Sequence, residues 1–273
     1  MKKLIPGFTG LIPKGADYFE TLKKYAGYGY KLTEGAAACF REGDPKENAK
    51  RIRDMGLELW TLGTTVQNGA YPDVKDLADR CHLVGVDHVT MYHSSSTSWR
   101  FADRDEHPGY DEAMGEIERM NRLANDLKKE GITFVFHNHD QEFITTFNGV
   151  QLFWLIAANC ENLKFELDTC WAHYAGENVP RLVKILGDRL AVLHVKDYTR
   201  GENFEDKPRW KVIVPRYTTP GSGIVDLQAI FMEAVKIDGL KYAIIEQDMP
   251  NKVMHDQIMQ AAITNLRETG YVE

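Results

Sequence analysis

The stretch from residue 134 to residue 142 decides the fold of this 273-residue chain and reads Phe-Val-Phe-His-Asn-His-Asp-Gln-Glu. Side chains in a β-strand alternate between two faces, so the two phenylalanines share one face while Val135, His137 and His139 share the other. One face is therefore aromatic, and the other ends in two imidazoles. Two neighbouring histidines at the end of an apolar strand are typical of a site that needs nitrogen ligands or a proton carrier.

Three later segments repeat this design. They are Lys-Phe-Glu-Leu-Asp-Thr-Cys-Trp at 164–171, Ala-Val-Leu-His-Val-Lys-Asp at 191–197 and Tyr-Ala-Ile-Ile-Glu-Gln-Asp at 242–248. Each has apolar side chains on one face, and the other face ends in Asp168, His194 or Glu246. Histidine, aspartate and glutamate together suit a divalent cation, so we expect these strand ends to form one site.

Strands and helices alternate along the whole chain. Expected strands cover residues 4–8, 30–36, 57–62 and 86–93, followed by the four segments above. Amphipathic patterns predict helices at 16–25, 45–55, 74–84, 110–127, 150–158, 180–186, 227–237 and 254–268. This alternation predicts an α/β fold, a single (β/α)8 TIM barrel domain spanning residues 1–273. A doubly wound open sheet is the alternative, and it is disfavoured because no G-x-G-x-x-G follows the first strand.

Composition excludes several classes of partner. The net charge is −7 and no run of lysines or arginines interleaves with aromatics, which argues against nucleic acid. No apolar stretch of about 18 residues could span a membrane, and the apolar run after Lys3 is too short for a signal peptide, so we expect a cytoplasmic protein. The four scattered cysteines indicate reduced thiols. The sequence leaves open whether the chain forms a homo-oligomer.

In a TIM barrel the carboxyl ends of the strands form the active face. His93 and Trp60, placed near the ends of strands four and three, are expected to line the wall opposite the ionisable cluster. Trp171 and Lys196 are further candidates for substrate contact. Two alternatives stay open: packing alone for Trp60, and an ion pair with Glu166 for Lys196.

The motifs F-H-N-H-D, L-D-T-C-W, H-V-K-D and I-I-E-Q-D occur in that order, and this order resembles the xylose-isomerase-like TIM barrel superfamily. That group contains sugar phosphate isomerases and epimerases, among them sugar 3-epimerases, and inosose dehydratases. The resemblance implies a divalent cation, with Mn2+ expected and Co2+, Fe2+, Zn2+ or Mg2+ as alternatives, held by Glu, Asp, His and Glu. Asp168, His194 and Glu246 match three of these positions.

The fourth position departs from the family pattern, because His137 stands where many relatives have glutamate. Either His137 is itself a ligand, or Glu142 folds back from the loop to restore the carboxylate. The departure weakens a simple two-glutamate epimerisation. His139 is the first candidate for the catalytic base, and Glu246 or Glu142 is the second.

The resemblance implies an enzyme that isomerises or epimerises a sugar or sugar phosphate through a metal-stabilised enediolate, with dehydration of a keto-sugar or keto-inositol as the alternative. Lys196 could donate to the developing oxyanion, and the Gly-Ser-Gly at 221–223 could offer amides to a phosphate. Apurinic endonucleases share the barrel, but they carry a histidine where this chain has Trp171. A sugar-binding barrel without metal is disfavoured by the intact Asp168, His194 and Glu246.

Overall fold

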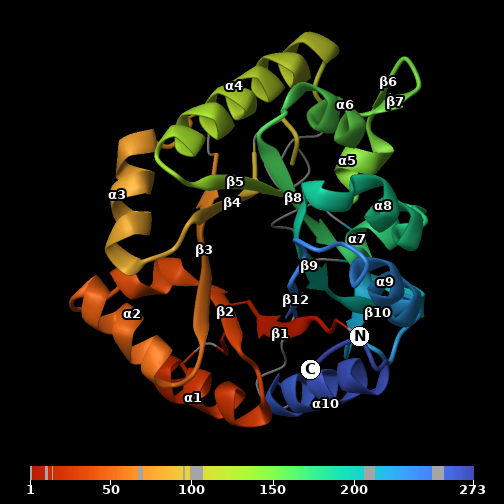
Figure 1. Cartoon of the computed structure of the whole chain (residues 1–273). Coiled ribbons are helices and arrows are strands. Elements are labelled where there is room, and N and C mark those ends of the chain that lie inside the picture. The colour runs from red at the N-terminus through yellow and green to blue at the C-terminus, as the bar shows by residue number, and fades with distance from the viewer. Residues whose placement is uncertain are drawn as a thin grey trace.

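Eight parallel strands close into a barrel, and helices surround it (Figure 1). The computed structural model describes residues 2–9, 12–13, 15–66, 70–94, 96–98, 107–205, 213–247 and 255–273. In barrel order the strands are β1 (Ile5–Phe8), β12 (Tyr242–Ile245), β9 (Leu190–Val195), β8 (Leu163–Asp168), β5 (Thr133–His137), β4 (His88–His93), β3 (Glu58–Thr65) and β2 (Leu32–Gly35). The predicted (β/α)8 barrel is confirmed.

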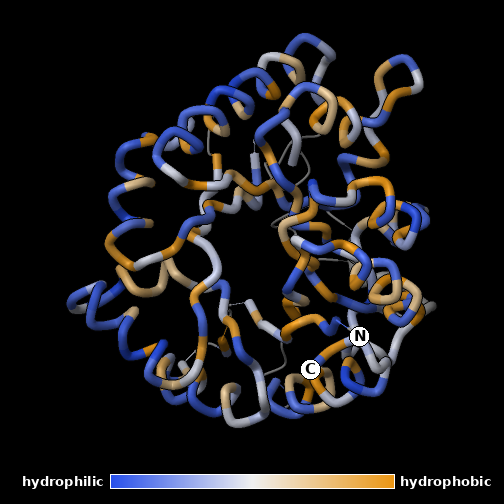
Figure 2. The backbone as a smooth tube through the Cα atoms, viewed as in Figure 1, coloured by the Kyte–Doolittle hydropathy of each residue, from blue (hydrophilic) through white to orange (hydrophobic). Residues whose placement is uncertain are grey.

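The outer helices begin where the sequence offers an N-cap. Asp17, Asp44 and Asp73 each accept a hydrogen bond from the backbone N–H three residues later, an arrangement that contributes about 1 kcal/mol per helix. The helices are α1 (Tyr18–Tyr28), α2 (Pro45–Asp54), α3 (Val74–Val84), α4 (Tyr110–Lys129), α6 (Leu152–Asn159), α8 (Val179–Leu186), α9 (Leu227–Ala234) and α10 (His255–Glu268). Their outer faces are largely hydrophilic, whereas the strands are largely hydrophobic (Figure 2).

The alternation in the opening stretch is confirmed along β5. Phe134 and Phe136 are fully buried in the large cluster between the strands and the helices. Val135 lies instead in a smaller cluster with Val192 and Ile244, on the opposite face of these strands. Burying each such side chain contributes about 1.5–3 kcal/mol, so the two faces of β5 fix its register in the barrel.

Several short elements were not predicted. The helix expected from residue 150 begins only at Leu152, because β6 (Thr146–Phe147) and β7 (Val150–Gln151) form a hairpin first. Its turn holds Asn148 at φ 51° and Gly149 at φ 81°, which favours a tight two-residue connection. The others are η1 (Ala36–Phe40), α5 (Gln141–Ile144), α7 (Thr169–Tyr174), η2 (Gly187–Arg189), β10 (Asp197–Glu205) and β11 (Ile213–Thr218).

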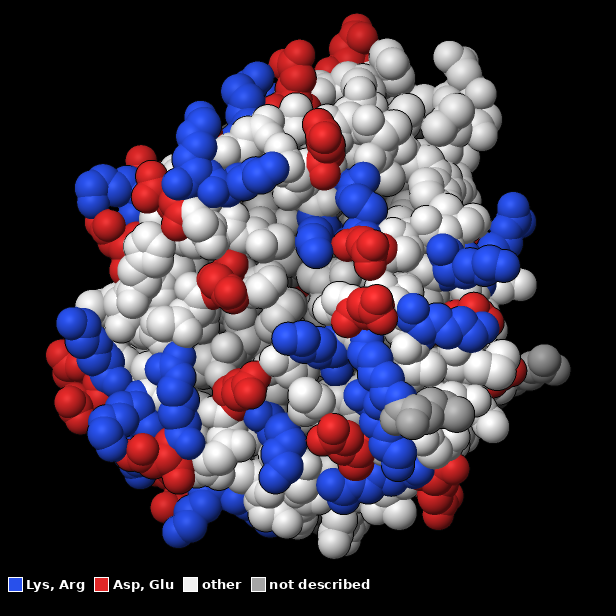
Figure 3. Space-filling view, in the orientation of Figure 1, with Lys and Arg blue, Asp and Glu red and all other residues white. Residues whose placement is uncertain are grey.

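The surface carries mixed charge. Acidic and basic side chains are interspersed on the face shown in Figure 3. No described helix combines the length and apolarity that crossing a membrane requires. The four cysteines are free and buried. Residue 254, where the last helix was expected to begin, lies outside the described residues.

Candidate metal centre

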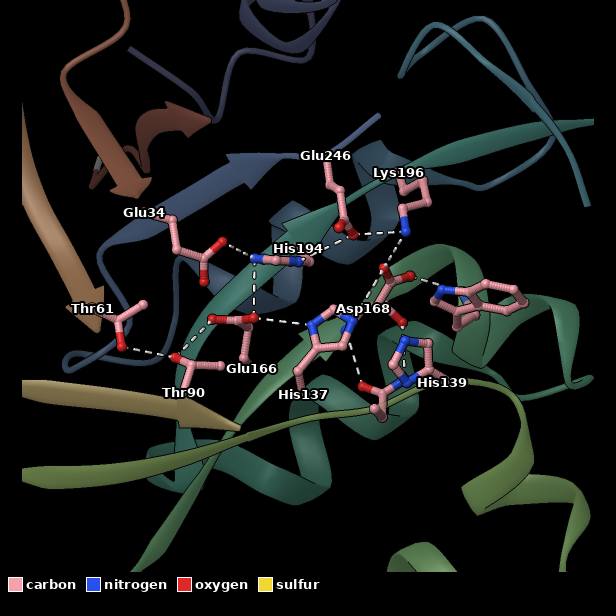
Figure 4. Close-up of polar contacts among 12 residues, drawn as sticks. Glu34, Thr61, Thr90, His137, His139, Glu166, Asp168, His194, Lys196 and Glu246 are labelled. Atoms are coloured by element: carbon pink, nitrogen blue, oxygen red, sulfur yellow. Dashed lines mark hydrogen bonds and ion pairs between the residues drawn. The ribbon is translucent and has the colours of Figure 1, made fainter. Parts of the chain in front are cut away.

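Four predicted ligand residues meet at the carboxyl ends of neighbouring strands. His137 and Asp168 end β5 and β8, His194 lies in β9, and Glu246 directly follows β12. One ligand atom from each lies within 4.8 Å of the others. His137, Asp168 and His194 are each at most 2% exposed. The expectation that these strands point their polar ends into one mouth is met (Figure 4).

Local hydrogen bonds orient Asp168. Its Oδ1 accepts the Trp171 backbone N–H at 2.8 Å and so caps α7, while Asn138 Oδ1 accepts the Asp168 backbone N–H at 2.9 Å. These two bonds fix the carboxylate and leave Oδ2 facing the cluster. Burial raises the pKa of Asp168, and the charge of Lys196 opposes that rise.

Lys196 joins the two carboxylates of the ligand group. Its Nζ lies 3.2 Å from Asp168 Oδ2 and 2.6 Å from Glu246 Oε2. Burial alone would raise the pKa of Glu246, but the charges of Lys196 and His194 hold it well below its usual range. The sequence had left open an ion pair between Lys196 and Glu166. In the structure the lysine pairs with Asp168 and Glu246 instead.

A second group, missed in the sequence, lies behind the first. Glu34 Oε2 and Glu166 Oε1 lie 2.9 Å and 3.0 Å from His194 Nε2, and these three residues could also hold a cation. The position of each glutamate in the sequence could have identified it. Glu34 lies near the carboxyl end of β2, as Glu246 lies just after β12. Glu166 shares a strand face with Asp168 because they are two residues apart.

The two ligand histidines have opposite pKa shifts. Burial lowers the pKa of His137 well below its usual value, and the neighbouring His194 lowers it further. Burial would also lower the pKa of His194, but the carboxylates of Glu166 and Glu34 raise it well above that value. Burial and Glu34 raise the pKa of Glu166.

Aromatic and imidazole rings form the wall beside the cluster. His139 stacks on His93 with ring centroids 4.8 Å apart and meets the edge of Trp171 at 5.6 Å. Lys196 Nζ lies 5.6 Å from the Trp171 ring and 5.3 Å from the Tyr217 ring. Burial lowers the pKa of His139 well below its ordinary value and that of His93 to about 4, so both rings are neutral near pH 7. Of the predicted substrate contacts, the structure brings His93, Trp171 and Lys196 together.

Glu142 bonds the backbone of the nearby loop. Its Oε2 accepts the His139 backbone N–H at 2.6 Å, and the residue is fully buried. Burial raises its pKa to about 8, so the carboxyl group is mainly protonated at neutral pH. The ligand groups among the described residues contain His137 and not Glu142. The structure therefore favours His137 of the two alternatives for the fourth ligand.

Trp60 lies at the opposite end of the barrel. It was placed near the end of its strand, but β3 continues to Thr65, so that placement was wrong. Its ring stacks on His88 with centroids 3.9 Å apart and contacts Tyr242, the first residue of β12. Trp60 thus packs at the amino end of the strands, which agrees with the alternative that it serves packing alone.

The amides of the Gly-Ser-Gly segment have an internal partner. Asp197 Oδ2 accepts the backbone N–H groups of Gly221 at 3.1 Å and Gly223 at 2.8 Å, and its Oδ1 accepts that of Val225 at 3.1 Å. These donors are already paired with a carboxylate, so the suggested phosphate site is wrong.

The residues present fit a divalent cation. Two imidazoles and two carboxylates with mutually close donor atoms are a common ligand set for Mn2+, Fe2+, Co2+ or Zn2+. Four buried or half-buried carboxylates, from Glu34, Glu166, Asp168 and Glu246, surround the rings. Such a concentration of carboxylates inside a protein is stabilised by bound cations.

The chain is a parallel (β/α)8 barrel with a cluster of histidines and carboxylates at the carboxyl ends of its strands, which is where TIM-barrel enzymes carry their active sites. The chain belongs to the family described as Xylose isomerase-like TIM barrel, which matches residues 15–269. The resemblance seen in the motifs is confirmed.

Individual relatives are distant. An inosose dehydratase of Geobacillus kaustophilus (strain HTA426) is 26% identical over 147 residues, which are 51% of this chain and 46% of that protein. The chain thus matches about half the length of that relative. The D-psicose 3-epimerase of Clostridium cellulolyticum H10, solved with D-tagatose, has a TM-score of 0.69 at 16% identity, covering 98% of this chain and 99% of that one. The IolI protein, solved with a zinc atom, has a TM-score of 0.66 at 17% identity, covering 98% and 96%.

Proposed function

We propose that this chain is an enzyme that uses one divalent cation to remove the proton beside the carbonyl group of a small carbohydrate. The observation that carries the proposal is the convergence of His137, Asp168, His194 and Glu246 within 4.8 Å. A cation held there would polarise the carbonyl and stabilise the enediolate. Mn2+ is the expected ion, and the zinc atom of the IolI structure supports zinc as an alternative.

The residues beside the centre divide into a base and a cationic donor. His139 is neutral because burial lowers its pKa, so its imidazole can accept the proton. Lys196 Nζ lies at the two carboxylates and can donate a hydrogen bond to a substrate oxygen. The rings of Trp171 and Tyr217 flank this lysine and offer apolar surface to a sugar face.

This pairing favours elimination of water from a keto-sugar or keto-inositol. One neutral base and one cationic donor provide what a dehydration needs: His139 would take the carbon-bound proton, and Lys196 would give a proton to the departing hydroxyl, which leaves as water. The match to an inosose dehydratase supports the same reaction class.

Isomerisation or epimerisation is the second candidate, and Glu246 favours it. The charges of Lys196 and His194 oppose the effect of burial and keep this carboxylate ionised, so it can serve as a second base. The structural similarity to D-psicose 3-epimerase supports this reaction.

Metal analysis followed by a solvent-exchange screen tests the proposal. Purified protein should bind about one divalent ion per chain, and Asp168→Asn should lose it while keeping the cap of α7. The exposed Glu161→Gln is the matched control and should bind normally. Ketoses, keto-inositols and 3-keto-glycosides should then be screened in D2O for deuterium uptake and loss of water. Wild-type protein that binds no divalent ion would refute the proposed function.

A further inference from the structure

We propose that Glu166 is a positioning residue that selects which ring nitrogen of His137 and of His194 faces the cation. This inference rests on the proposed function, because it concerns the same centre. Glu166 is fully buried inside the barrel, two residues before Asp168 on the same face of β8. It would act through the two histidines and would not contact an ion held by His137, Asp168, His194 and Glu246.

One oxygen of Glu166 contacts both rings. Oε1 lies 2.9 Å from His137 Nδ1 and 3.0 Å from His194 Nε2, as the dashed lines of Figure 4 show. In its ionised form, Glu166 accepts hydrogen bonds through this oxygen, so each nitrogen that faces it carries a proton. A neutral imidazole has its lone pair on the other nitrogen. Glu166 therefore leaves His137 Nε2 and His194 Nδ1 as the ligand atoms.

The two remaining nitrogens point toward the ligand carboxylates. His137 Nε2 lies 4.0 Å from Asp168 Oδ2, and His194 Nδ1 lies 3.3 Å from Glu246 Oε2. The nitrogens selected by Glu166 thus belong to the compact ligand group. The opposite tautomer of His137 would place its lone pair against Glu166 and an N–H against the cation.

Other contacts hold Glu166 in place. Its Oε2 is 3.4 Å from Thr90 Oγ1, which in turn lies 3.0 Å from Thr61 Oγ1. These threonines come from β4 and β3, two and three strands away from β8 in the barrel, so the carboxylate is also supported from that side. Partners of this kind behind metal-bound histidines generally change metal affinity by about 10–100-fold when they are removed.

Glu34 provides a matched control. It is also a buried glutamate, with 4% exposure, and its Oε2 lies 2.9 Å from His194 Nε2. Among the contacts described it reaches His194 and not His137. Removing Glu34 should therefore leave the His137 tautomer unchanged, whereas removing Glu166 should not.

The test combines nitrogen NMR with metal titration. In metal-free wild-type protein, long-range 1H–15N spectra should show His137 protonated on Nδ1. Glu166→Met should lose this preference and weaken Zn2+ and Co2+ binding by about 10–100-fold, measured by competition with a chelator. Glu166→Gln keeps an acceptor oxygen, so it should retain the tautomer and most of the affinity. Glu34→Met should keep the His137 tautomer.

Each outcome separates this inference from the proposed function. Wild-type protein that binds no ion would refute the proposed function, whereas tight binding that is unchanged in Glu166→Met would refute the positioning role alone. Equal losses in Glu166→Met and Glu166→Gln would also refute it, since charge rather than hydrogen bonding would then matter. If Glu166→Met does not fold, the wild-type spectrum decides: His137 protonated on Nε2 overturns the inference.

Discussion

Replacing Glu142 with glutamine is expected to remove a pH-dependent loss of stability from this protein. The Glu142 side chain is fully buried, and its Oε2 accepts the His139 backbone N–H at 2.6 Å. Burial raises the pKa of this carboxyl group from 4.5 to about 8. Between those two values the folded protein keeps a proton that the unfolded chain releases.

The sign and size follow from this difference in bound protons. Where the folded state holds more protons, the free energy of unfolding falls as pH rises, by about 1.4 kcal/mol per unit for one group. The loss begins near the unfolded pKa and is complete above the folded one, for a total of about 5 kcal/mol. Glutamine keeps an acceptor oxygen for the His139 N–H but cannot ionise, so Glu142→Gln lacks this slope.

Urea unfolding at several pH values, in EDTA to remove metal effects, measures the difference. Wild-type protein and Glu142→Gln should have similar stability near pH 5, and the variant should become more stable as pH rises toward 9. The exposed Glu20→Gln is the control and should follow the wild type. Parallel curves for wild type and Glu142→Gln would show that Glu142 is already ionised in the folded protein and would refute the reasoning.

Three further results are expected. His139→Gln should keep the metal but slow deuterium uptake by about 100-fold or more, and unchanged exchange would exclude His139 as the base. Lys196→Met should bind divalent ions more tightly, because it removes a cation from beside two ligand carboxylates; weaker binding by calorimetry would contradict this. Gly223→Ala should lower the free energy of unfolding by about 1–3 kcal/mol, because its Cβ would lie 2.2 Å from Asp197 Oδ1. An unchanged thermal midpoint would show that this loop can move aside.

The barrel could be predicted from the sequence because the patterns that indicate its strands and its helices are both local. Period-two alternation fixed the strand faces, and caps such as Asp44 followed by Pro45 fixed the helix starts. The β6–β7 hairpin was missed although Asn148-Gly149 is a strong turn signal. The apolar run that follows it favoured a longer helix, and strands of two residues give no detectable period.

The candidate site was only partly predictable, because some of its contacts cross the barrel. Asp168, His194 and Glu246 could be identified because each closes a strand that reads clearly in the sequence. Glu34 and His194 touch across 160 positions of chain, and no local pattern specifies that contact. The choice between His137 and Glu142 also depended on a loop, where Glu142 bonds the His139 backbone instead of turning inward.

Trp60 shows why the ends of strands matter for function in a barrel. Thr65, the last residue of β3, lies five positions beyond it, and a strand rises about 3.3 Å per residue. Trp60 therefore lies about 16 Å from the strand end, whereas a strand ending at residue 62 would have placed it only about 7 Å away. His137 avoids this problem because it is itself the last residue of β5, next to the loop that carries His139. In this fold a residue's distance from the strand end, more than its chemical type, decides whether it can take part in catalysis.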